Sequence, residues 1–349
     1  ELYDLPLLKG VKYHEIFYYN KKKGISKIIS YVISLYKLFK LIQKCPPEYI
    51  HMQWFLSPFI DYLWIRALKL FGYKGKFIKT VHNARSRYNL IITFQSNLCL
   101  KQMDKIIVHS DMCKKYLVSN IPKLQKKSIF VGRHGLFNTS KDHLLSQKED
   151  EIYKSIVNIS KQHKNTFIFA GNISPYKGFD TVIKAWEIYK GSTKNKNFSC
   201  LIVLGRFEKE LIYLKEKATK FSSSVLVVDK YLSDNLLNLS IQKSNFILLT
   251  HKYISHSGLY SDFIKHKKIH IYTNTNSNHM LSHKVFKKTG IPFNGNHKDL
   301  AEVFRTLDIR NNSLIKQKIK HKDWEEAINY FSWENCFPKE LVNKIYKVS

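Results

Sequence analysis

A lysine and two glycines stand where an apolar run gives way to a helical pattern, in FIFAGNISPYKGFDTVIKAW (167–186). The apolar run predicts a strand that ends at Gly171, and the helical pattern begins near Phe179. A glycine at a strand end lets the backbone come close to a bound group. N–H groups at the start of the next helix attract an anion, and Lys177 with Gly178 brings a positive charge to the same turn. The segment indicates a phosphate site, although the same residues could form an ordinary turn.

Two later segments repeat this order of strand, polar loop and helix. In NFILLTHKYISHSGLYSDF, Ser257 and Gly258 open a helix, where hydroxyl and backbone N–H groups can hold an anion. In LIVLGRF, Gly205 and Arg206 follow another strand and bring a further cation. Because the carboxyl ends of parallel strands meet at one sheet edge, the three loops together suit a diphosphate. An ordinary capped helix is the alternative for the loop that holds Ser257.

The elements that must position these loops alternate between strands and helices along the chain. In the first half we expect helices at 27–44 and 58–71, and strands at 48–54, 76–83, 105–110 and 128–135. In the second half we expect strands near 166–170, 198–204, 224–228, 245–249 and 268–272, each followed by a helical pattern. A polar stretch at 138–165 reads as a linker with a short helix. The expected fold class is α/β, with parallel sheets covered by helices on both faces.

The length of 349 residues, 44% of them hydrophobic, is enough for two medium domains. We expect an N-terminal domain at 1–150 and a C-terminal domain at 151–330, both Rossmann-like, doubly wound and facing a central cleft. The five cysteines are scattered and form no CxxC pair, so they predict reduced thiols rather than disulfides or a zinc site. With no secretory signal and no long apolar run, a cytoplasmic location is expected, soluble or peripheral on the inner face of the membrane.

The charge balance of 58 Lys and Arg against 27 Asp and Glu gives a formal net charge of +31. Such an excess favours an anionic membrane surface, phosphorylated ligands or nucleic acid as partners, or it reflects a biased composition. Nucleic acid is the least favoured, because the aromatic residues lie mostly within apolar runs rather than beside basic clusters. Residues 27–44 have polar positions at 27, 30, 34, 37, 40 and 44, which predict a helix with a wide apolar face and a basic stripe. That helix either rests on an anionic membrane or belongs to the core.

The segment 167–186 resembles the F-x-G-x-I-x-P-Y-K-G loop of GT-B glycosyltransferases of the broad family 4 group. TVHN (80–83), IIVHS (106–110), RHG (133–135), the SG helix start and the terminal FSWENCFPKELVNKIY fall in that family's order. The resemblance implies a GT-B glycosyltransferase of hexosyltransferase type, with a nucleotide-diphosphate sugar as donor and a saccharide or lipid-linked saccharide as acceptor. It places the protein in bacterial surface polysaccharide or glycolipid assembly. It also implies that 331–349 forms a last helix that crosses back to the N-terminal domain.

The same resemblance assigns roles to residues of this sequence. Lys177 would hold the donor diphosphate, and Tyr231 lies where the family contacts the base. His82 matches the histidine that faces the transferred sugar, where an imidazole can share a proton near neutral pH. The candidates are His82 for catalysis; Gly171, Asn172, Lys177, Gly178, Gly205, Arg206, Tyr231, Ser257, Gly258, Leu259 and Asp262 for donor binding; and Asn83, His134, Gly135 and Tyr253 as others.

The sequence departs from the family pattern near the donor loops. Asn172 stands where an arginine is usual, and Ser255 and Phe263 replace two glutamates, with Asp262 the only nearby acid. Tyr253–Gly258 has the Y-x-x-x-S-G form of a family subset, which indicates a variant enzyme. Donor identity and the retention or inversion of the anomeric centre stay open. The family's first strand precedes the region where this chain starts, so it is either absent or reduced to remains near the N-terminus.

No metal ion or cofactor is expected besides the sugar nucleotide, because a helix start and Lys177 can neutralise a leaving diphosphate. His251 and His256 share a loop, but no Asp-x-Asp element accompanies them. Three alternatives remain. One is another reaction on this fold, such as epimerisation, which would need paired carboxylates. The others are a non-catalytic sugar-nucleotide binder and a nucleic-acid-binding protein that uses the positive charge.

Overall fold

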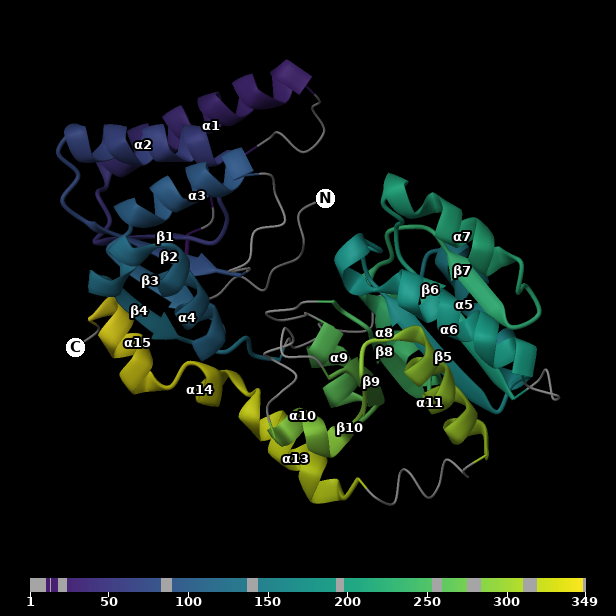
Figure 1. The fold of residues 1–349 in the computed structure, drawn as a ribbon. Coiled ribbons are helices and arrows are strands. Elements are labelled where there is room, and N and C mark those ends of the chain that lie inside the picture. The colour runs from purple at the N-terminus through teal and green to yellow at the C-terminus, as the bar shows by residue number, and fades with distance from the viewer. Residues whose placement is uncertain are drawn as a thin grey trace. The chain divides into compact units, whose positions relative to one another are not determined.

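The computed structural model describes residues 11–12, 14–17, 24–82, 90–136, 144–192, 198–252, 259–274, 284–309 and 319–347. The chain divides into two compact units. The first comprises Glu1–Val81, Arg85–Val108 and Lys115–Phe130, and the second comprises His82–Ala84, His109–Lys114 and Val131–Ser349. Two parallel sheets with helices give an α/β fold, as predicted (Figure 1). The domain limits expected from the sequence stay predictions.

The smaller sheet has four strands in the order β1-β2-β3-β4. The strands are β1 (Tyr49–Met52), β2 (Lys76–Val81), β3 (Lys105–Val108) and β4 (Ser128–Val131). The helices beside it in sequence are α1 (Gly24–Lys44), α2 (Pro58–Leu70), α3 (Leu90–Gln102), α4 (Asp111–Asn120) and the 3-10 turn η1 (Pro122–Lys126). All four predicted strands are present, but each is shorter than the sequence suggested. In particular, β2 and β3 end at Val81 and Val108, which pair in parallel register, so His82 and His109 lie just beyond them.

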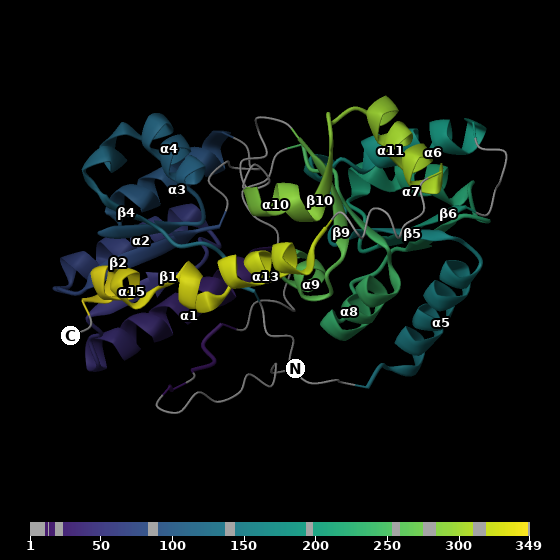
Figure 2. The same ribbon diagram turned by 90° about the horizontal axis from the view of Figure 1, so that it is seen from below.

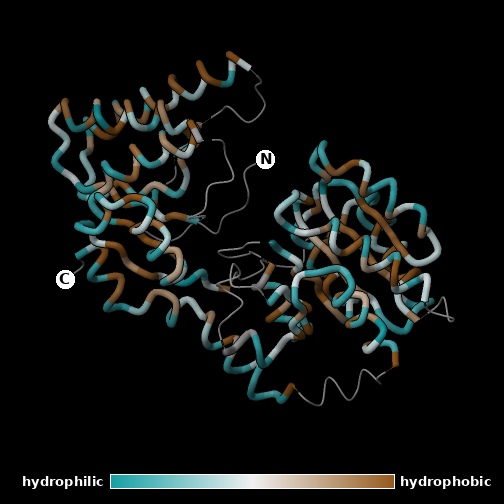
Figure 3. Tube along the Cα trace, viewed as in Figure 1, coloured by the Kyte–Doolittle hydropathy of each residue, from teal (hydrophilic) through white to brown (hydrophobic). Residues whose placement is uncertain are grey.

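Helix α1 buries the side that carries its serines and leaves most of its apolar residues exposed. Ser30 and Ser34 are buried, whereas Ile25, Ile28, Ile29, Val32, Ile33 and Tyr36 are 46% to 76% exposed. The apolar stretches along α1 can be followed in Figure 3. The reason lies in polar contacts with α2: Tyr31 donates its hydroxyl proton to the buried carboxylate of Asp61, and Trp64 Nε1 donates to Leu35 O at 3.0 Å. A hydroxyl that bonds to its own helix, as Ser34 does, removes the cost of burying it.

The larger sheet has six strands in the order β10-β9-β8-β5-β6-β7, and all its pairs are parallel. The strands are β5 (Asn165–Ala170), β6 (Ser199–Leu204), β7 (Val225–Val228), β8 (Phe246–Leu249), β9 (Ile269–Thr273) and β10 (Gly290–Phe293). The first five match the prediction. Strand β10 is not predicted from the sequence, because it is short and contains Pro292. A proline is tolerated there because β10 is an edge strand.

Helices cover both faces of the larger sheet (Figure 2). They are α5 (Gln147–Lys161), α6 (Phe179–Ser192), α7 (Ile212–Thr219), α8 (Asp234–Lys243), α9 (Leu259–Lys265), α10 (Lys284–Thr289) and α11 (His297–Ile309), with the 3-10 turns η2 (Pro175–Lys177) and η3 (Lys209–Leu211). Alternate residues of β5 point to opposite sides: Phe167 and Phe169 join the core under α6 and α11, and Ile168 and Ala170 join the core under α5 and α8. The sheet is therefore buried on both faces, as a doubly wound fold requires.

The amino ends of β5 and β6 are tied to α11 by one buried carboxylate. Asp308 accepts hydrogen bonds from Asn165 Nδ2 at 3.1 Å and from Ser199 Oγ at 2.6 Å, and it also accepts one from the Tyr189 hydroxyl. The side chains are almost fully buried, so each bond is made away from water. This cluster fixes the end of the sheet opposite to the predicted phosphate loops.

Two further predictions need correction at the ends of the larger unit. The polar stretch before β5 contains a 15-residue helix, α5, rather than a short one, and a capping box between Ser146 and Glu149 starts it. The terminal stretch predicted as one last helix is α14 (Trp333–Cys336) and α15 (Lys339–Tyr346), preceded by α13 (His321–Tyr330). Ser332 caps α14, and Pro338 stands at the start of α15, so the helix is interrupted between them. The five cysteines are free thiols, as predicted.

Candidate functional site

The loop after β5 buries the ammonium group of Lys177 against the end of the strand. Lys177 is 8% exposed, and its Nζ donates to Ala170 O at 3.0 Å. Gly171 has a φ of +91°, and a Cβ at this position would lie 2.4 Å from that Nζ. Only glycine therefore leaves room for the ammonium group while adopting this backbone conformation. A positive charge is held beside the backbone at the carboxyl end of β5, as the sequence led us to expect.

The neighbouring strand β6 brings a second glycine against the first. Gly205 has a φ of +137°, and a Cβ there would lie 2.2 Å from Gly171 O. Gly171 N donates to Leu204 O at 2.9 Å, so the two strand ends stay paired up to the glycines. Gly171 and Gly205 are thus in direct contact, and the exposed side chain of Arg206 follows immediately.

Residues after β8 close the loop from the other side. Gly178 has a φ of +75°, and a Cβ there would lie 2.1 Å from Thr250 O. Thr250 Oγ1 donates to Lys177 O at 2.9 Å, and Lys252 N donates to Tyr176 O at 2.8 Å. Sequence reasoning did not single out Thr250. The available signal was its position directly after an apolar strand, where a hydroxyl can reach the backbone of the adjacent strand's loop.

The start of α9 brings Leu259, one of the predicted donor-site residues, next to Gly171. Leu259 Cδ1 lies 3.8 Å from the position that a Cβ on Gly171 would take. Asp262 lies less than one turn further along α9 and is mostly buried. Burial raises the pKa of the Asp262 carboxyl to about 6, with Asp234 adding to the shift and Lys265 opposing it. Such a carboxyl can switch between accepting and donating a hydrogen bond near neutral pH.

Other predicted donor-site residues are not gathered around Lys177. The side chain of Asn172 points to the surface and donates to Glu208 Oε1 at 2.9 Å. Tyr231 is 82% exposed on the loop after β7, which is an edge strand. Four further candidates lie outside the described residues: Asn83, Tyr253, Ser257 and Gly258.

A second cluster consists of three histidine rings at the ends of β2, β3 and β4. His109 Nε2 lies 3.2 Å from His82 Nδ1, and His109 Nδ1 lies 2.9 Å from Gly132 O. The ring of His134 packs edge-on against His109 with centroids 5.5 Å apart, and its Nδ1 donates to Gly135 O at 2.9 Å. Burial lowers the pKa of His134 and favours its neutral form. The structure thus brings together His82, His134 and Gly135, which were candidates, with His109, which was not.

The turn at 132–135, which carries the Gly132 carbonyl group and His134, packs against the C-terminal segment, which comprises α14 and α15. A Cβ on Gly132 would lie 2.5 Å from the Phe337 ring, and one on Gly135 would lie 2.4 Å from the Trp333 ring. Arg133 Nη2 donates to Asn335 O at 2.7 Å. Both glycines are therefore required by the close approach of an aromatic ring of the C-terminal segment.

His109 could have been found from the sequence by comparing two strand ends. KTVH and IIVH end in the same Val-His pair, and Val81 pairs with Val108 in the parallel sheet. Residues that follow a registered pair lie next to each other at one sheet edge. The missing information was the register, which a single sequence does not supply.

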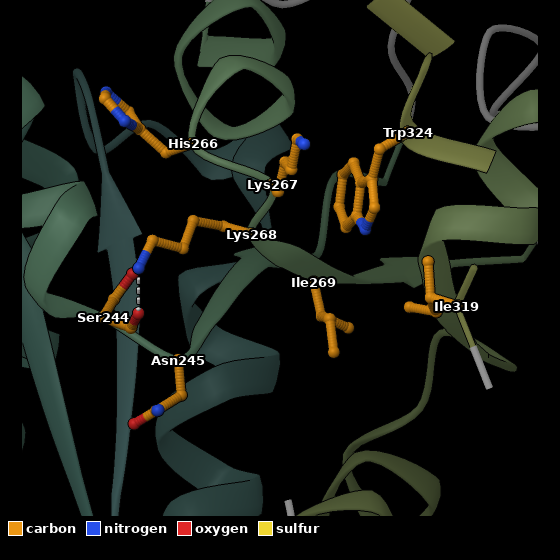
Figure 4. A pocket seen from close by; sticks show the side chains of 8 residues that line it. All are labelled: Ser244, Asn245, His266, Lys267, Lys268, Ile269, Ile319 and Trp324. Atoms are coloured by element: carbon orange, nitrogen blue, oxygen red, sulfur yellow. Dashed lines mark hydrogen bonds between the residues drawn. The ribbon is translucent and has the colours of Figure 1, made fainter. Parts of the chain in front are cut away.

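Among the described residues no group of three His, Cys, Asp or Glu is placed to hold a metal ion. A cavity of about 290 Å³ lies elsewhere, at the amino ends of β8 and β9 (Figure 4). It is lined by Ser244, Asn245, His266, Lys267, Lys268, Ile269, Ile319 and Trp324. Lys268 Nζ donates there to Ser244 O at 2.8 Å and to Gln242 O at 2.7 Å, so its ammonium group holds the backbone together. This cavity is at the opposite strand ends from Lys177.

Comparison with solved structures identifies the architecture. The α,α-trehalose-phosphate synthase (UDP-forming) of Burkholderia vietnamiensis matches with a TM-score of 0.68 and 9% identity, over 94% of this chain and 81% of that one. The enzyme of Burkholderia xenovorans in complex with glucose-6-phosphate matches with a TM-score of 0.64 and 9% identity, over 92% and 79%. The chain has the GT-B fold. Anabaena HepE in complex with UDP is a further GT-B match, with a TM-score of 0.63 and 11% identity over 90% and 82%.

At these identities the likeness establishes the fold. No protein-family model matches the sequence, and no curated protein sequence is significantly similar to it. The fold nevertheless indicates where a ligand would bind, because open parallel sheets bind ligands outside the carboxyl ends of their strands. The Lys177 loop and the histidine cluster both lie at such ends.

Proposed function

We propose that this protein is a glycosyltransferase that moves a sugar from a nucleotide-diphosphate donor to a saccharide or lipid-linked saccharide acceptor. The observation that carries the proposal is the Lys177 ammonium group, buried beside left-handed Gly171 at the end of β5 in a GT-B fold. Solved structures of the same fold contain UDP or glucose-6-phosphate. A buried cation beside a glycine-rich strand end suits the diphosphate of such a donor.

In the proposed reaction the protein supplies positioning and charge. The Lys177 ammonium group stabilises the diphosphate as it leaves, and Gly171 and Gly205 let the donor approach the backbone. The acceptor hydroxyl binds near His82 and gives up its proton as its oxygen bonds to the anomeric carbon. The proposal includes that the transfer needs no metal ion and that the transferred sugar is a hexose. It also includes a role in bacterial surface polysaccharide or glycolipid assembly at the inner face of the cytoplasmic membrane.

A thermal-shift screen with UDP, GDP, ADP, CMP and their sugar conjugates tests the donor site. A ligand at 100 times its Kd stabilises the folded state by about 2.7 kcal/mol. One nucleotide should therefore raise the Tm of the wild type, and Lys177→Ala should lose that increase. The matched control is Lys184→Ala, which removes the same charge from an exposed position on α6. If no nucleotide shifts the wild type while short RNA does, the proposal fails and the positive charge serves nucleic acid.

The exposed face of α1 supports membrane association as part of this function. Its apolar residues are Ile25, Ile28, Ile29, Val32, Ile33 and Tyr36, and the exposed lysines of the same helix are Lys27, Lys37, Lys40 and Lys44. Apolar side chains beside lysines fit the headgroup region of an anionic bilayer, where each lysine contributes roughly 1 kcal/mol. No helix in the described part of the chain is long and apolar enough to cross a membrane.

Sedimentation with phosphatidylcholine vesicles, with and without phosphatidylglycerol, tests this surface. The wild type should pellet with the anionic vesicles and release as salt is raised, because screening weakens the lysine contribution. Replacing Ile29 and Ile33 by Asp should abolish pelleting. Leu144→Asp is the control, since Leu144 is 99% exposed outside α1. Equal pelleting of the double variant and the wild type would rule out α1 as the membrane surface.

A further inference from the structure

Hydrogen bonds connect His82, the candidate catalytic residue, through His109 to a backbone carbonyl group. His109 is 8% exposed, and both of its ring nitrogens have partners: Gly132 O at 2.9 Å from Nδ1 and His82 Nδ1 at 3.2 Å from Nε2. The rings of His82 and His109 lie 5.1 Å apart. Their arrangement follows from the parallel pairing of Val81 with Val108, which precede them.

The carbonyl group of Gly132 determines which ring nitrogens of His109 and His82 carry protons. A carbonyl oxygen only accepts, so His109 Nδ1 carries the proton that it donates to Gly132 O. In the neutral ring His109 Nε2 then holds a lone pair and can only accept. The contact with His82 is therefore a hydrogen bond in which His82 Nδ1 donates. The lone pair of neutral His82 consequently lies on Nε2.

We propose that His109 is a positioning residue that selects the Nδ1–H tautomer of His82 for proton transfer. The inference rests on the proposed function, in which His82 takes the proton of the acceptor hydroxyl. As the hydroxyl oxygen bonds to the anomeric carbon, the bond from that carbon to the diphosphate oxygen breaks, and its electron pair leaves with the diphosphate. The hydroxyl proton moves to His82 Nε2. In the other tautomer Nε2 already carries a proton and cannot accept one.

The groups around the pair keep this arrangement in place. The Phe337 ring occupies the space where a side chain on Gly132 would lie, so Gly132 packs directly against the C-terminal segment. Arg133 directs its guanidinium group to the Tyr330 ring at 4.1 Å and to Asn335 O. His134, which packs against His109, is held towards its neutral form by burial.

Nitrogen-15 NMR of the imidazole rings tests the tautomer directly, without a substrate. The His82 signals are assigned by their loss in His82→Gln. In the wild type they should report a protonated Nδ1 and an unprotonated Nε2. In His109→Phe the Nε2–H tautomer should become dominant, whereas in His109→Gln the side-chain carbonyl group can still accept from Nδ1 and should preserve much of the wild-type pattern. His163→Phe removes another buried histidine, which donates to Ile159 O, and should leave the His82 signals unchanged.

Turnover gives the second readout once a donor and acceptor are in hand. The kcat of His109→Phe should fall by roughly 10- to 100-fold and that of His109→Gln by less, while nucleotide-induced stabilisation persists in both. A wild-type His82 that is protonated on Nε2 would overturn the inference whatever the variants do. Equal losses of kcat in both variants, with the His82 tautomer unchanged, would also overturn it. Absence of any nucleotide shift in the wild type would instead count against the proposed function, since the NMR measurement does not depend on it.

Discussion

Replacing Gly171 by Ala should weaken both nucleotide binding and the fold. A Cβ at this position would lie 2.4 Å from Lys177 Nζ, which is the far end of a flexible side chain. The ammonium group can therefore move away, but it then loses its hydrogen bond to Ala170 O. The main effect is the displacement of the positive charge from the end of β5.

The magnitude follows from two costs. A side chain at a φ of +91° costs roughly 1–2 kcal/mol, and loss of a hydrogen bond from a charged donor costs roughly 1.5–3 kcal/mol. The stiffer unfolded chain of the alanine variant returns about 0.4–1 kcal/mol. We expect the free energy of unfolding to fall by about 2 to 4 kcal/mol. Loss of the ammonium–diphosphate bond should weaken nucleotide binding about 10- to 100-fold.

Urea unfolding and calorimetric titration with the nucleotide found in the thermal-shift screen measure the two effects. The matched control is Gly191→Ala on α6, where a Cβ would meet no atom within 4 Å. That variant should bind nucleotide like the wild type and gain about 0.5–1 kcal/mol of stability. If Gly171→Ala also binds like the wild type, Lys177 does not hold the nucleotide in the position seen here. The reasoning about this loop would then be refuted.

Three further changes should act through different parts of the molecule. Replacing Asp308 by Asn should lower the free energy of unfolding by roughly 3 kcal/mol in urea, because the buried carboxylate accepts three side-chain hydrogen bonds. Replacing Gly205 by Ala should prevent folding of the strand ends, because a Cβ would lie 2.2 Å from the rigid carbonyl oxygen of Gly171, and circular dichroism on heating should show a large drop in Tm. Burial holds the pKa of Lys79 in the folded protein at about 7. Between pH 7 and 10 the unfolded chain therefore binds more protons than the folded protein does. The free energy of unfolding of the wild type should rise over that range by on the order of 4 kcal/mol. Lys79→Met should remove that rise in urea titrations at several pH values.

The Lys177 loop could be predicted from sequence because its information is local. An apolar run, a glycine and a Lys-Gly pair lie within one strand–loop–helix unit, and each residue acts through its own backbone or charge. The contact between Gly205 and Gly171 could be anticipated only as proximity at a sheet edge. The close approach of the two residues depends on β5 and β6 being adjacent strands, and this is known only from the strand order of the sheet.

The burial of α1 could not be predicted from its own pattern. The helix has apolar residues around most of its circumference, so periodicity does not say which side is buried. The decision comes from α2, where buried Asp61 and Trp64 offer a hydrogen-bond acceptor and a donor to Tyr31 and Leu35 O. Polar groups on the partner helix thus draw the serine side of α1 inward and leave its isoleucines exposed.

The histidine cluster shows how much chemistry can depend on strand register alone. Neighbouring parallel strands lie about 4.8 Å apart, and the rings of His82 and His109 are separated by 5.1 Å because they follow the registered pair Val81 and Val108. A shift of one residue in that pairing would turn one histidine to the other face of the sheet and break the hydrogen bond. The Val-His pairs at the two strand ends become a single site only through this pairing, so the register of β2 and β3 links the sequence to the proposed proton transfer.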